Sequence, residues 1–370
     1  MSSGEAPMAM GEAAAPASPA DPGNGRRAIG LWLLACCATI YAMVVLGGVT
    51  RLTGSGLSMV DWRPILGVLP PLNEAQWLRV FELYQQSPEF KVKNFGMDLA
   101  SFKNIFWFEY AHRLLGRLIG VIFLVPLLYF AATRRVDKAL AGKLVALFIL
   151  GGLQGLLGWY MVQSGLVDVP RVSPYRLTAH LGLAFVIYGY MFWVALDVLR
   201  PHGWAARIGD MTGLRRLAYG VTGLIAVTML SGGFVAGLRA GLAYNTFPLM
   251  NGQWVPDGLL SMDPIWRNLF ENITTVQFDH RLLAAVTSIA IVMLWLASLR
   301  RRLPTALQAA SHVLLLLLAF QVTLGITTLL LHVPVPLAAA HQAGALALLT
   351  AALFLTHGLT KVKAAQPDGA

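Results

Sequence analysis

The sequence contains few charged residues. Asp, Glu, Lys and Arg make up 12% of its 370 residues, whereas hydrophobic residues make up 56%. Soluble domains carry about 25% charged residues, so this composition excludes an ordinary soluble protein. The apolar residues also form runs that are long enough to cross a bilayer core of about 30 Å. The sequence therefore predicts an all-α membrane protein with several spans.

Cysteine is almost absent. The only two cysteines, Cys36 and Cys37, are neighbours in an apolar run, so the chain cannot form a disulfide framework and both are expected to serve packing. Leu34-Ala35-Cys36 loosely resembles a lipoprotein cleavage site. The apolar stretch before it is too short for a signal peptide, so we interpret this segment as part of a span.

Acidic residues are fewer than basic residues, 18 against 28, which gives a net charge of +10. This charge does not indicate a nucleic-acid partner. The basic residues lie in short clusters between apolar runs, as topology signals do. If the chain alternates across the membrane, five clusters fall on one side, and the positive-inside rule places this side and both termini in the cytoplasm. The clusters are Arg26-Arg27, Arg134-Arg135-Lys138-Lys143, Arg200-Arg207-Arg215-Arg216, Arg300-Arg301-Arg302 and Lys361-Lys363.

Eight apolar runs have the length of a transmembrane helix. Two of the links between them, at about 51–104 and 239–272, are long, and both lie on the side away from the basic clusters. The predicted spans lie at about 28–50, 105–131, 143–164, 175–198, 215–238, 273–299, 306–331 and 336–358.

The two ends of the chain are predicted to be cytoplasmic tails, at residues 1–27 and 361–370. The first tail is rich in Ala, Pro, Gly and Ser without periodicity, which is typical of disorder. It carries Glu5, Glu12 and Asp21, and it lacks the Arg-rich amphipathic pattern of a mitochondrial transit peptide. This favours the inner membrane of a bacterium as the location.

Both long links contain segments with helical features. Apolar residues recur at helical spacing between Asn73 and Gln86, and Asn73 forms a capping pair with Gln76. A second helix start is predicted at Asp263-Pro264. We interpret both segments as short amphipathic helices on the outer membrane surface, and ordinary ordered loops are the alternative.

The two halves of the chain repeat the same motifs span by span. Because each half has four spans, the two repeats share one orientation. We therefore predict two four-helix bundles, at 28–200 and 201–360, related by an axis along the membrane normal. The matching segments are Gly47-Gly48 with Gly232-Gly233, Gly56-Leu57 with Gly241-Leu242, His112–Leu115 with His280–Leu283, Gln154 and Leu157-Gly158 with Gln321 and Leu324-Gly325, and Ala179-His180 with Ala340-His341.

Four histidines lie inside the predicted spans at one depth. His112, His180, His280 and His341 occupy spans two, four, six and eight, a few residues past the outer end of each. An ionisable residue inside a membrane is costly and is a candidate for function. Two imidazoles that face each other across a bundle can hold one haem iron as axial ligands. Hydrogen bonding between helices is the structural alternative, and pairs of two fit zinc poorly.

An arginine directly follows the first histidine of each pair. Arg113 and Arg281 would lie near the outer surface, where haem propionates could supply anions, and interfacial snorkelling is the alternative. The remaining four histidines lie near helix ends or in links and are expected not to be ligands. They are His202, His312, His332 and His357.

The repeat breaks at one carboxylate. Glu109 lies three residues before His112 and projects from nearly the same helix face, whereas Gln277 occupies the matching position in the second half. The second half instead has Asp279, which faces away from His280. A carboxyl beside one iron site could serve proton or charge chemistry, and capping of the helix dipole is the alternative. The difference between the halves favours function for Glu109.

These motifs resemble those of the haem A synthase family. The resemblance covers about residues 28–360 and rests on Gly47–Ser58, Glu109–Arg113 and Phe278–Arg281, together with the repeat and the four histidines. The chain is most similar to the branch found in alphaproteobacteria and mitochondria, which has a long first outer link. Like that branch, the chain lacks the cysteine pair that other bacterial members carry there.

The resemblance implies an activity and its site residues. The family oxidises the C8 methyl of haem O to a formyl group by successive hydroxylations, which gives haem A for cytochrome c oxidase. His280 and His341 would ligate a resident haem b in the second half. Haem O, the substrate, would bind between His112 and His180, with Glu109 as the catalytic carboxylate.

The resemblance also implies partners. These are haem O synthase, cytochrome oxidase assembly factors and an electron-transfer partner that the sequence does not identify, and a homo-oligomer is compatible with the pattern. The alternative function is a di-haem b electron carrier of the quinone-reactive kind, and a transporter built from parallel repeats is a third. Two haems near one membrane face argue against such a carrier, and the lack of a polar midplane site argues against a transporter.

Overall fold

The computed structural model describes residues 22–61, 68–166, 172–201, 203–208 and 210–364, and it confirms the all-α fold. Most of the predicted first tail and the last residues of the second lie outside these ranges. Within them, eight helices are long and apolar enough to cross a membrane, and each matches one predicted span. They are α1 (Pro22–Leu52), α4 (Leu99–Ala132), α5 (Lys138–Gly165), α6 (Pro174–Leu199), α7 (Thr212–Leu238), α9 (Ile273–Leu299), α10 (Thr305–Leu330) and α11 (Val335–Lys361).

Local sequence signals set the ends of these helices. The first helix, α1, begins at Pro22, earlier than predicted, because proline is favoured in the first turn and the following residues continue the helix. Asp98 and Asp137 cap α4 and α5 by accepting hydrogen bonds from Ser101 N and Leu140 N. Asn272 does the same for α9. Capped starts of this kind fix the register of each span relative to the loops.

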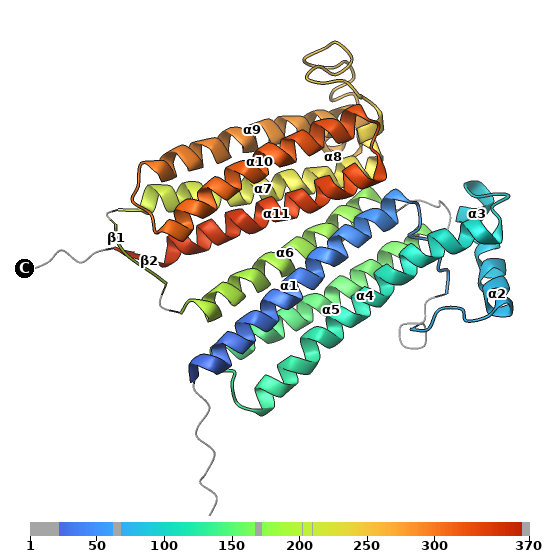
Figure 1. The fold of residues 1–370 in the computed structure, drawn as a ribbon. Coiled ribbons are helices and arrows are strands. Elements are labelled where there is room, and N and C mark those ends of the chain that lie inside the picture. The colour runs from blue at the N-terminus through green and yellow to red at the C-terminus, as the bar shows by residue number, and fades with distance from the viewer. Residues whose placement is uncertain (1–21, 62–67, 167–171, 202, 209, 365–370) are drawn as a thin grey trace, which may run out of the picture.

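The eight long helices pack as two neighbouring groups of four (Figure 1). Helices α1, α4, α5 and α6 form the first group, and α7, α9, α10 and α11 form the second. Contacts among α1, α6, α7 and α11 join the groups, so these four helices form the centre of the molecule. They also supply most of the buried apolar core. The two groups coincide with the two halves of the sequence repeat.

The two ends of the helical array differ. Figure 1 shows the C-terminus and the start of α1 at one end, which we call the terminal end, and α2, α3 and α8 at the other, which we call the loop end. At the terminal end, strands β1 (Trp204–Ile208) and β2 (Val362–Ala364) pair in parallel, which the sequence did not predict. Arg215 supports this junction by donating to Leu359 O and Val362 O at 2.8 and 2.7 Å.

The first long link forms the predicted helix and covers the start of α4. Helices α2 (Glu74–Gln85) and α3 (Pro88–Val92) form a unit that we call the cap. Asn73 accepts a hydrogen bond from Gln76 N, as the capping pair predicted. The interpretation of α2 as a membrane-surface helix was wrong, because its apolar face is buried against α4. The packed side chains are Trp77, Phe81 and Tyr84 of α2 with Phe102 and Phe106 of α4.

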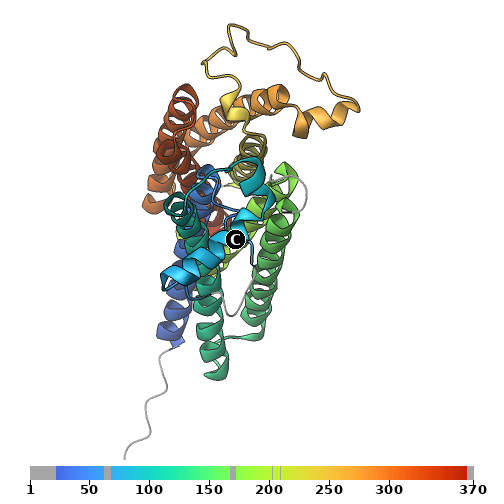
Figure 2. The same ribbon diagram turned by 90° about the vertical axis from the view of Figure 1, so that its right-hand side faces the viewer.

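The second long link is less regular. It contains two short 3₁₀ helices, η1 (Ala240–Leu242) and η2 (Ile265–Arg267), and then α8 (Asn268–Glu271). The helix start predicted at Asp263-Pro264 is confirmed by η2. Buried Asn268 organises this link by donating to Met262 O and Ile265 O. In Figure 2 the link, coloured yellow to orange, extends over the loop end and beyond the helices.

Candidate functional site

Each of the four intramembrane histidines packs against a glycine of the preceding long helix. A larger residue would force the ring to shift, because an added Cβ would lie closer to the imidazole than ordinary van der Waals contact. The Cβ-to-ring distances are 3.0 Å for Gly47 and His112, 3.0 Å for Gly158 and His180, 3.1 Å for Gly232 and His280, and 2.9 Å for Gly325 and His341.

These glycines are the ones that the sequence repeat matched. Gly47 corresponds to Gly232, and Gly158 corresponds to Gly325, so the same helix-to-histidine contact occurs in both halves. All four histidines lie in helices that begin at the loop end. His180, His280 and His341 lie six or seven residues past the first residue of their helices, whereas His112 lies 13 residues past the start of the longer α4, so the common depth stays a prediction. The two histidines within each half are near enough for their charges to interact. The structure therefore brings together the two predicted pairs.

A glutamine supports the second histidine of each pair. Gln154 Nε2 donates to His180 O at 3.0 Å, and Gln321 Nε2 donates to His341 O at 3.0 Å. Both glutamines belong to the repeat, but the sequence alone gave them no role. His280 has a different support, since its Nδ1 lies 2.7 Å from Ser231 Oγ. The same glutamines also reach the rings, with Gln154 Nε2 at 3.4 Å from His180 Nε2 and Gln321 Nε2 at 3.1 Å from His341 Nδ1. Contacts to ring nitrogens restrict the orientation of the imidazoles, as ligands of a metal require.

The chemistry of the site fits pairs of axial ligands rather than a compact metal centre. Among the described residues, no three His, Cys, Asp or Glu side chains converge on one point, which excludes an ordinary zinc site there. Buried His180 Nδ1 has no hydrogen-bond partner in this part of the chain. An imidazole nitrogen without a protein partner is available for a ligand, so the first pair fits axial ligation of a haem iron. In the second pair one ring nitrogen of each histidine is contacted, by Ser231 or Gln321, which leaves the other nitrogen of each ring for a ligand.

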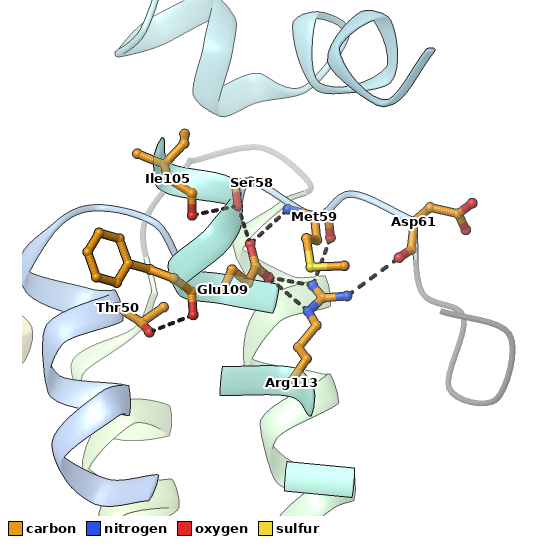
Figure 3. A network of polar contacts seen from close by, with 8 residues as sticks. Thr50, Ser58, Met59, Asp61, Ile105, Glu109 and Arg113 are labelled. Atoms are coloured by element: carbon orange, nitrogen blue, oxygen red, sulfur yellow. Dashed lines mark hydrogen bonds and ion pairs between the residues drawn. The ribbon is translucent and has the colours of Figure 1, made fainter. Parts of the chain in front are cut away.

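Glu109 is held in a dense polar network at the loop end (Figure 3). The side chain is 2% exposed. Arg113 donates to Oε1 from Nε at 3.0 Å and from Nη2 at 2.5 Å. Ser58 Oγ and Met59 N donate to Oε2, both at 2.7 Å. Four hydrogen-bond donors therefore satisfy one buried carboxylate and fix its orientation.

This network explains the first glycine-rich motif of the sequence. The segment after Gly47-Gly48 turns back at the end of α1, which brings Ser58 and Met59 over the start of α4. Thr50 ties the two helices together, since its Oγ1 lies 3.3 Å from Phe108 O. In the sequence, this motif carries part of the repeat and of the family resemblance, but it indicates no contact with Glu109. Its contacts with Glu109 join positions about 50 residues apart, which periodicity cannot reveal.

The second half repeats the arginine contact without the carboxylate. Arg113 Nη2 donates to Met59 O at 2.7 Å, and Arg281 Nη2 donates to the matching Tyr244 O at 2.9 Å. Gln277, the counterpart of Glu109, donates from Nε2 to Tyr244 O at 3.2 Å and to Ala240 O at 2.9 Å. The halves thus share a scaffold but differ in charge at one buried position.

The two arginines consequently differ in what they can bind. Arg113 has an internal anion in Glu109, whereas within the described residues no carboxylate lies at ion-pair distance from Arg281. Arg281 Nε is also buried without an acceptor there. A half-buried guanidinium beside His280 that lacks an internal anion fits a haem propionate. Of the two predicted propionate ligands, the geometry favours Arg281.

The two sites meet at the contact between α1 and α11. Gln342 follows His341 and donates from Nε2 to Val44 O at 2.8 Å. Its side chain also contacts Gly48, the neighbour of the glycine that packs on His112. Tyr41 OH donates to Ala343 O at 2.6 Å. These bonds fix the depth of His341 relative to the first half.

The other described histidines lie away from both pairs. His357 is buried at the terminal end, where its Nε2 lies 3.1 Å from Asp197 Oδ1. His312 accepts from Trp295 Nε1 at 3.0 Å. His332 follows the end of α10 at the loop end, and His202 lies outside the described residues. None of the three described ones is placed beside the four paired histidines.

The comparisons with known proteins agree with this architecture. Residues 30–353 match the model of the COX15-CtaA family, described as cytochrome oxidase assembly protein. The chain is 56% identical to "Heme A synthase" of Nitrosospira multiformis, over 91% of this chain and 94% of that protein. It is 53% identical to "Heme A synthase" of Paramagnetospirillum magneticum, over 92% and 96% of the two chains.

The relatives also include a mitochondrial protein. The chain is 49% identical to "Heme A synthase COX15" of Homo sapiens, over 91% of this chain and 83% of that protein. This agrees with the predicted resemblance to the branch shared by alphaproteobacteria and mitochondria. The match covers all eight long helices, both histidine pairs and the Glu109 network. The chain therefore belongs to the COX15-CtaA family of cytochrome oxidase assembly proteins, with haem A synthases as its relatives.

Proposed function

We propose that this chain makes haem A by oxidising the C8 methyl of haem O, and that its two halves have different roles in this reaction. The observation that carries the division is the asymmetry at positions 109 and 277. Both halves have a histidine pair and an arginine on the same scaffold, but only the first has a buried carboxylate. The relatives named haem A synthase, with about half of their residues identical to this chain, support the activity.

The second half is the proposed site of the resident haem b. His280 and His341 would be the axial ligands, and Arg281 would bind a propionate. Bound haem b supplies a centre that accepts and donates single electrons. Ser231 and Gln321 restrict the two imidazoles through ring-nitrogen contacts, and Gln342 holds His341 against the first half. These contacts suit a site that keeps one group permanently.

The first half is the proposed site of the substrate haem O. His112 and His180 would bound it, and Glu109 would be the catalytic carboxylate. Because Arg113, Ser58 and Met59 hold Glu109, its charge can lie at a fixed place near the substrate. A positioned carboxylate can accept a proton from a reacting group or stabilise positive charge that develops on it. Arg113 is already paired with Glu109, so any contact of Arg113 with a haem propionate would add to this ion pair.

The location and partners follow from the same proposal. The basic clusters lie at the terminal end, so the loop end with both histidine pairs would face the periplasm of a bacterial inner membrane. Haem O synthase would supply the substrate, and cytochrome oxidase assembly factors would receive the product. An electron-transfer partner would exchange electrons with the second half.

Identification of the bound haems tests the proposal directly. The protein would be purified after expression with and without haem O synthase, and its haems would be extracted and separated by chromatography. We expect haem b in both preparations and haem A only when haem O is available. Two equivalents of haem b, with no haem A under either condition, would instead indicate a di-haem b electron carrier.

A further inference from the structure

The cap contains a second buried carboxyl group that the proposed chemistry does not use. Glu89 of α3 is 4% exposed. Its donors are distant, since Tyr84 OH lies 3.4 Å away and Lys93 Nζ 3.9 Å away. Glu109, by contrast, has four donors within 3.0 Å. A buried carboxylate with such weak compensation is costly, so the protonated form of Glu89 is favoured.

The charged and titratable groups around Glu89 come from three elements. Lys93, which follows α3, supplies a positive charge, and Glu109 of α4 supplies a negative charge. Tyr84 of α2 supplies a hydroxyl that also accepts from Asn94 Nδ2 at 2.6 Å. Burial, with a smaller contribution from the charge of Glu109, raises the pKa of Glu89 to about 7, while Lys93 and the Tyr84 hydroxyl oppose the rise. The group can therefore gain or lose a proton near neutral pH.

The cap places Glu89 over the Glu109 network. The ring of Tyr84 stacks on Phe102, with 5.0 Å between the ring centroids. Phe102, Phe106 and Glu109 follow one face of α4, because they are four and then three residues apart. Seven residues of helix correspond to about 10 Å. Contacts therefore lead from Glu89 through Tyr84 to Phe102, two helical turns from Glu109, and the charge of Glu109 acts on Glu89 across this apolar layer.

The second half differs at its loop end. Glu271 there is partly exposed and receives two hydrogen bonds from Arg267 and one from Tyr175. Its pKa is lowered, first by the hydrogen bond from Arg267. Asp279, beside His280, is half-buried. The buried and weakly compensated Glu89 thus belongs to the half that carries Glu109.

We infer that Glu89 is a proton-binding site that balances the charge of Glu109. Glu89 holds a proton while Glu109 is ionised and paired with Arg113, and it releases that proton when Glu109 takes up another. Coupling of this kind needs no hydrogen-bonded path between the groups, because each charge changes the proton affinity of the other. The site would allow the buried substrate half to change its charge state without accumulating net charge. This role in turnover rests on the proposed function, whereas proton binding does not.

Infrared spectroscopy of the substrate-free protein tests proton binding. We expect a carbonyl band of a protonated carboxyl group that disappears as pH rises through about 7. Glu89→Gln should abolish the band, and the exposed control Glu82→Gln should retain it. Glu109→Gln should shift its titration to lower pH, because the neighbouring negative charge is gone. A band that persists in Glu89→Gln, or does not shift in Glu109→Gln, would overturn the inference.

The pH dependence of haem A formation tests the role of Glu89 in turnover and distinguishes its failure from failure of the proposed function. In Glu89→Gln the rate of haem A formation should lose its dependence on pH near 7, while Glu82→Gln keeps the wild-type profile. An unchanged profile in Glu89→Gln would remove Glu89 from turnover. If no variant or wild-type protein makes haem A but the infrared titration appears as expected, the proton site stands and the proposed function fails.

Discussion

At the scale of single residues, the two halves differ in how they neutralise the arginine that follows a histidine. Arg113 is paired with Glu109, and the pair is fixed by Ser58. The second half has alanine and glutamine at the positions that match Ser58 and Glu109, so donor and acceptor changed together. A coordinated difference of this kind indicates that the first half is built to hold a carboxylate.

Glu109→Gln keeps the shape of the side chain and removes its charge. We expect haem A formation to fall by at least about 100-fold, as loss of a general acid–base group does. Haem b content should stay unchanged, because His280 and His341 lie in the other half. The measurement is the haem composition of the purified variant, where unreacted haem O should accumulate. Normal haem A production would leave the carboxylate with a structural role only.

The control for this change is Glu82→Gln, which removes an exposed carboxylate from the cap. Gln277→Glu, the reverse change in the second half, would be a poor control. Gln277 Nε2 donates to two carbonyl oxygens, and a glutamate would place negative charge against both.

Residue spacing predicted which helix faces carry the candidate site residues, but it did not predict the ion pair between Arg113 and Glu109. Periodicity placed Glu109 beside His112 on one helix face. It could not predict that Arg113 neutralises Glu109, since a haem propionate and a protein carboxylate are equally suitable anions. The supports Ser58 and Gln154 depend on contacts between separate helices, which a single sequence does not reveal.

At the scale of elements, the glycines of the repeat set the distance between each histidine and the next helix. Gly325→Ala would place a Cβ 2.9 Å from the ring of His341. Overpacking of this kind costs about 1–3 kcal/mol. We expect the affinity for haem b to fall at least about tenfold, measured by haem content and by the spectrum of the purified protein.

Two further variants show whether the effect is local. Gly158→Ala makes the same contact with His180, so it should lower haem O binding and leave haem b in place. Gly155→Ala lies one turn away on α5, where an added Cβ has no neighbour within 4 Å, and it should behave as wild type. Loss of haem b in Gly155→Ala would show that contact between the added Cβ and a histidine ring is not the cause of the effect.

The cap should loosen as pH rises. The folded pKa of Glu89, about 7, lies above its ordinary value of 4.5. The contribution of Glu89 to stability is therefore complete below about pH 4.5 and is lost as pH rises through 7. We expect limited proteolysis between residues 74 and 92 to be faster at pH 8.5 than at pH 6. Glu89→Gln should remove the difference, and equal rates in the wild type would contradict the account.

The helices themselves were largely predictable. Length and hydropathy placed all eight spans because the bilayer demands long apolar helices. The membrane-surface assignment of α2 failed for a physical reason: amphipathic periodicity shows that one face is apolar, not whether lipid or protein covers it. Phe102 and Phe106 cover it here.

At the scale of the whole molecule, both ends of the array join the two halves. The sequence repeat predicted two bundles, but it did not predict which helices meet between them. At the terminal end, Asp197 of α6 binds Lys143 of α5 and both His357 and Lys361 of α11, at 3.3, 3.1 and 2.9 Å. This cluster connects the first half to the last helix of the second.

Asp197→Asn should loosen that connection. The substitution removes the only carboxylate among these four residues and leaves buried His357 beside two lysines. We expect a loss of about 1–3 kcal/mol, seen as a lower thermal midpoint in detergent. Haem b affinity should change little, because the histidine pairs lie at the opposite end. A thermal midpoint equal to that of the wild type would show that the cluster does not hold the halves together.

The central claim is that the second half keeps haem b and the first half oxidises haem O. The most direct measurement is the haem content of His112→Ala and His280→Ala proteins, purified from cells that supply haem O. The account predicts that His280→Ala loses the low-spin haem b spectrum, whereas His112→Ala retains haem b in full and makes no haem A. Full retention of haem b in His280→Ala, together with its loss in His112→Ala, would contradict the assignment of the two halves.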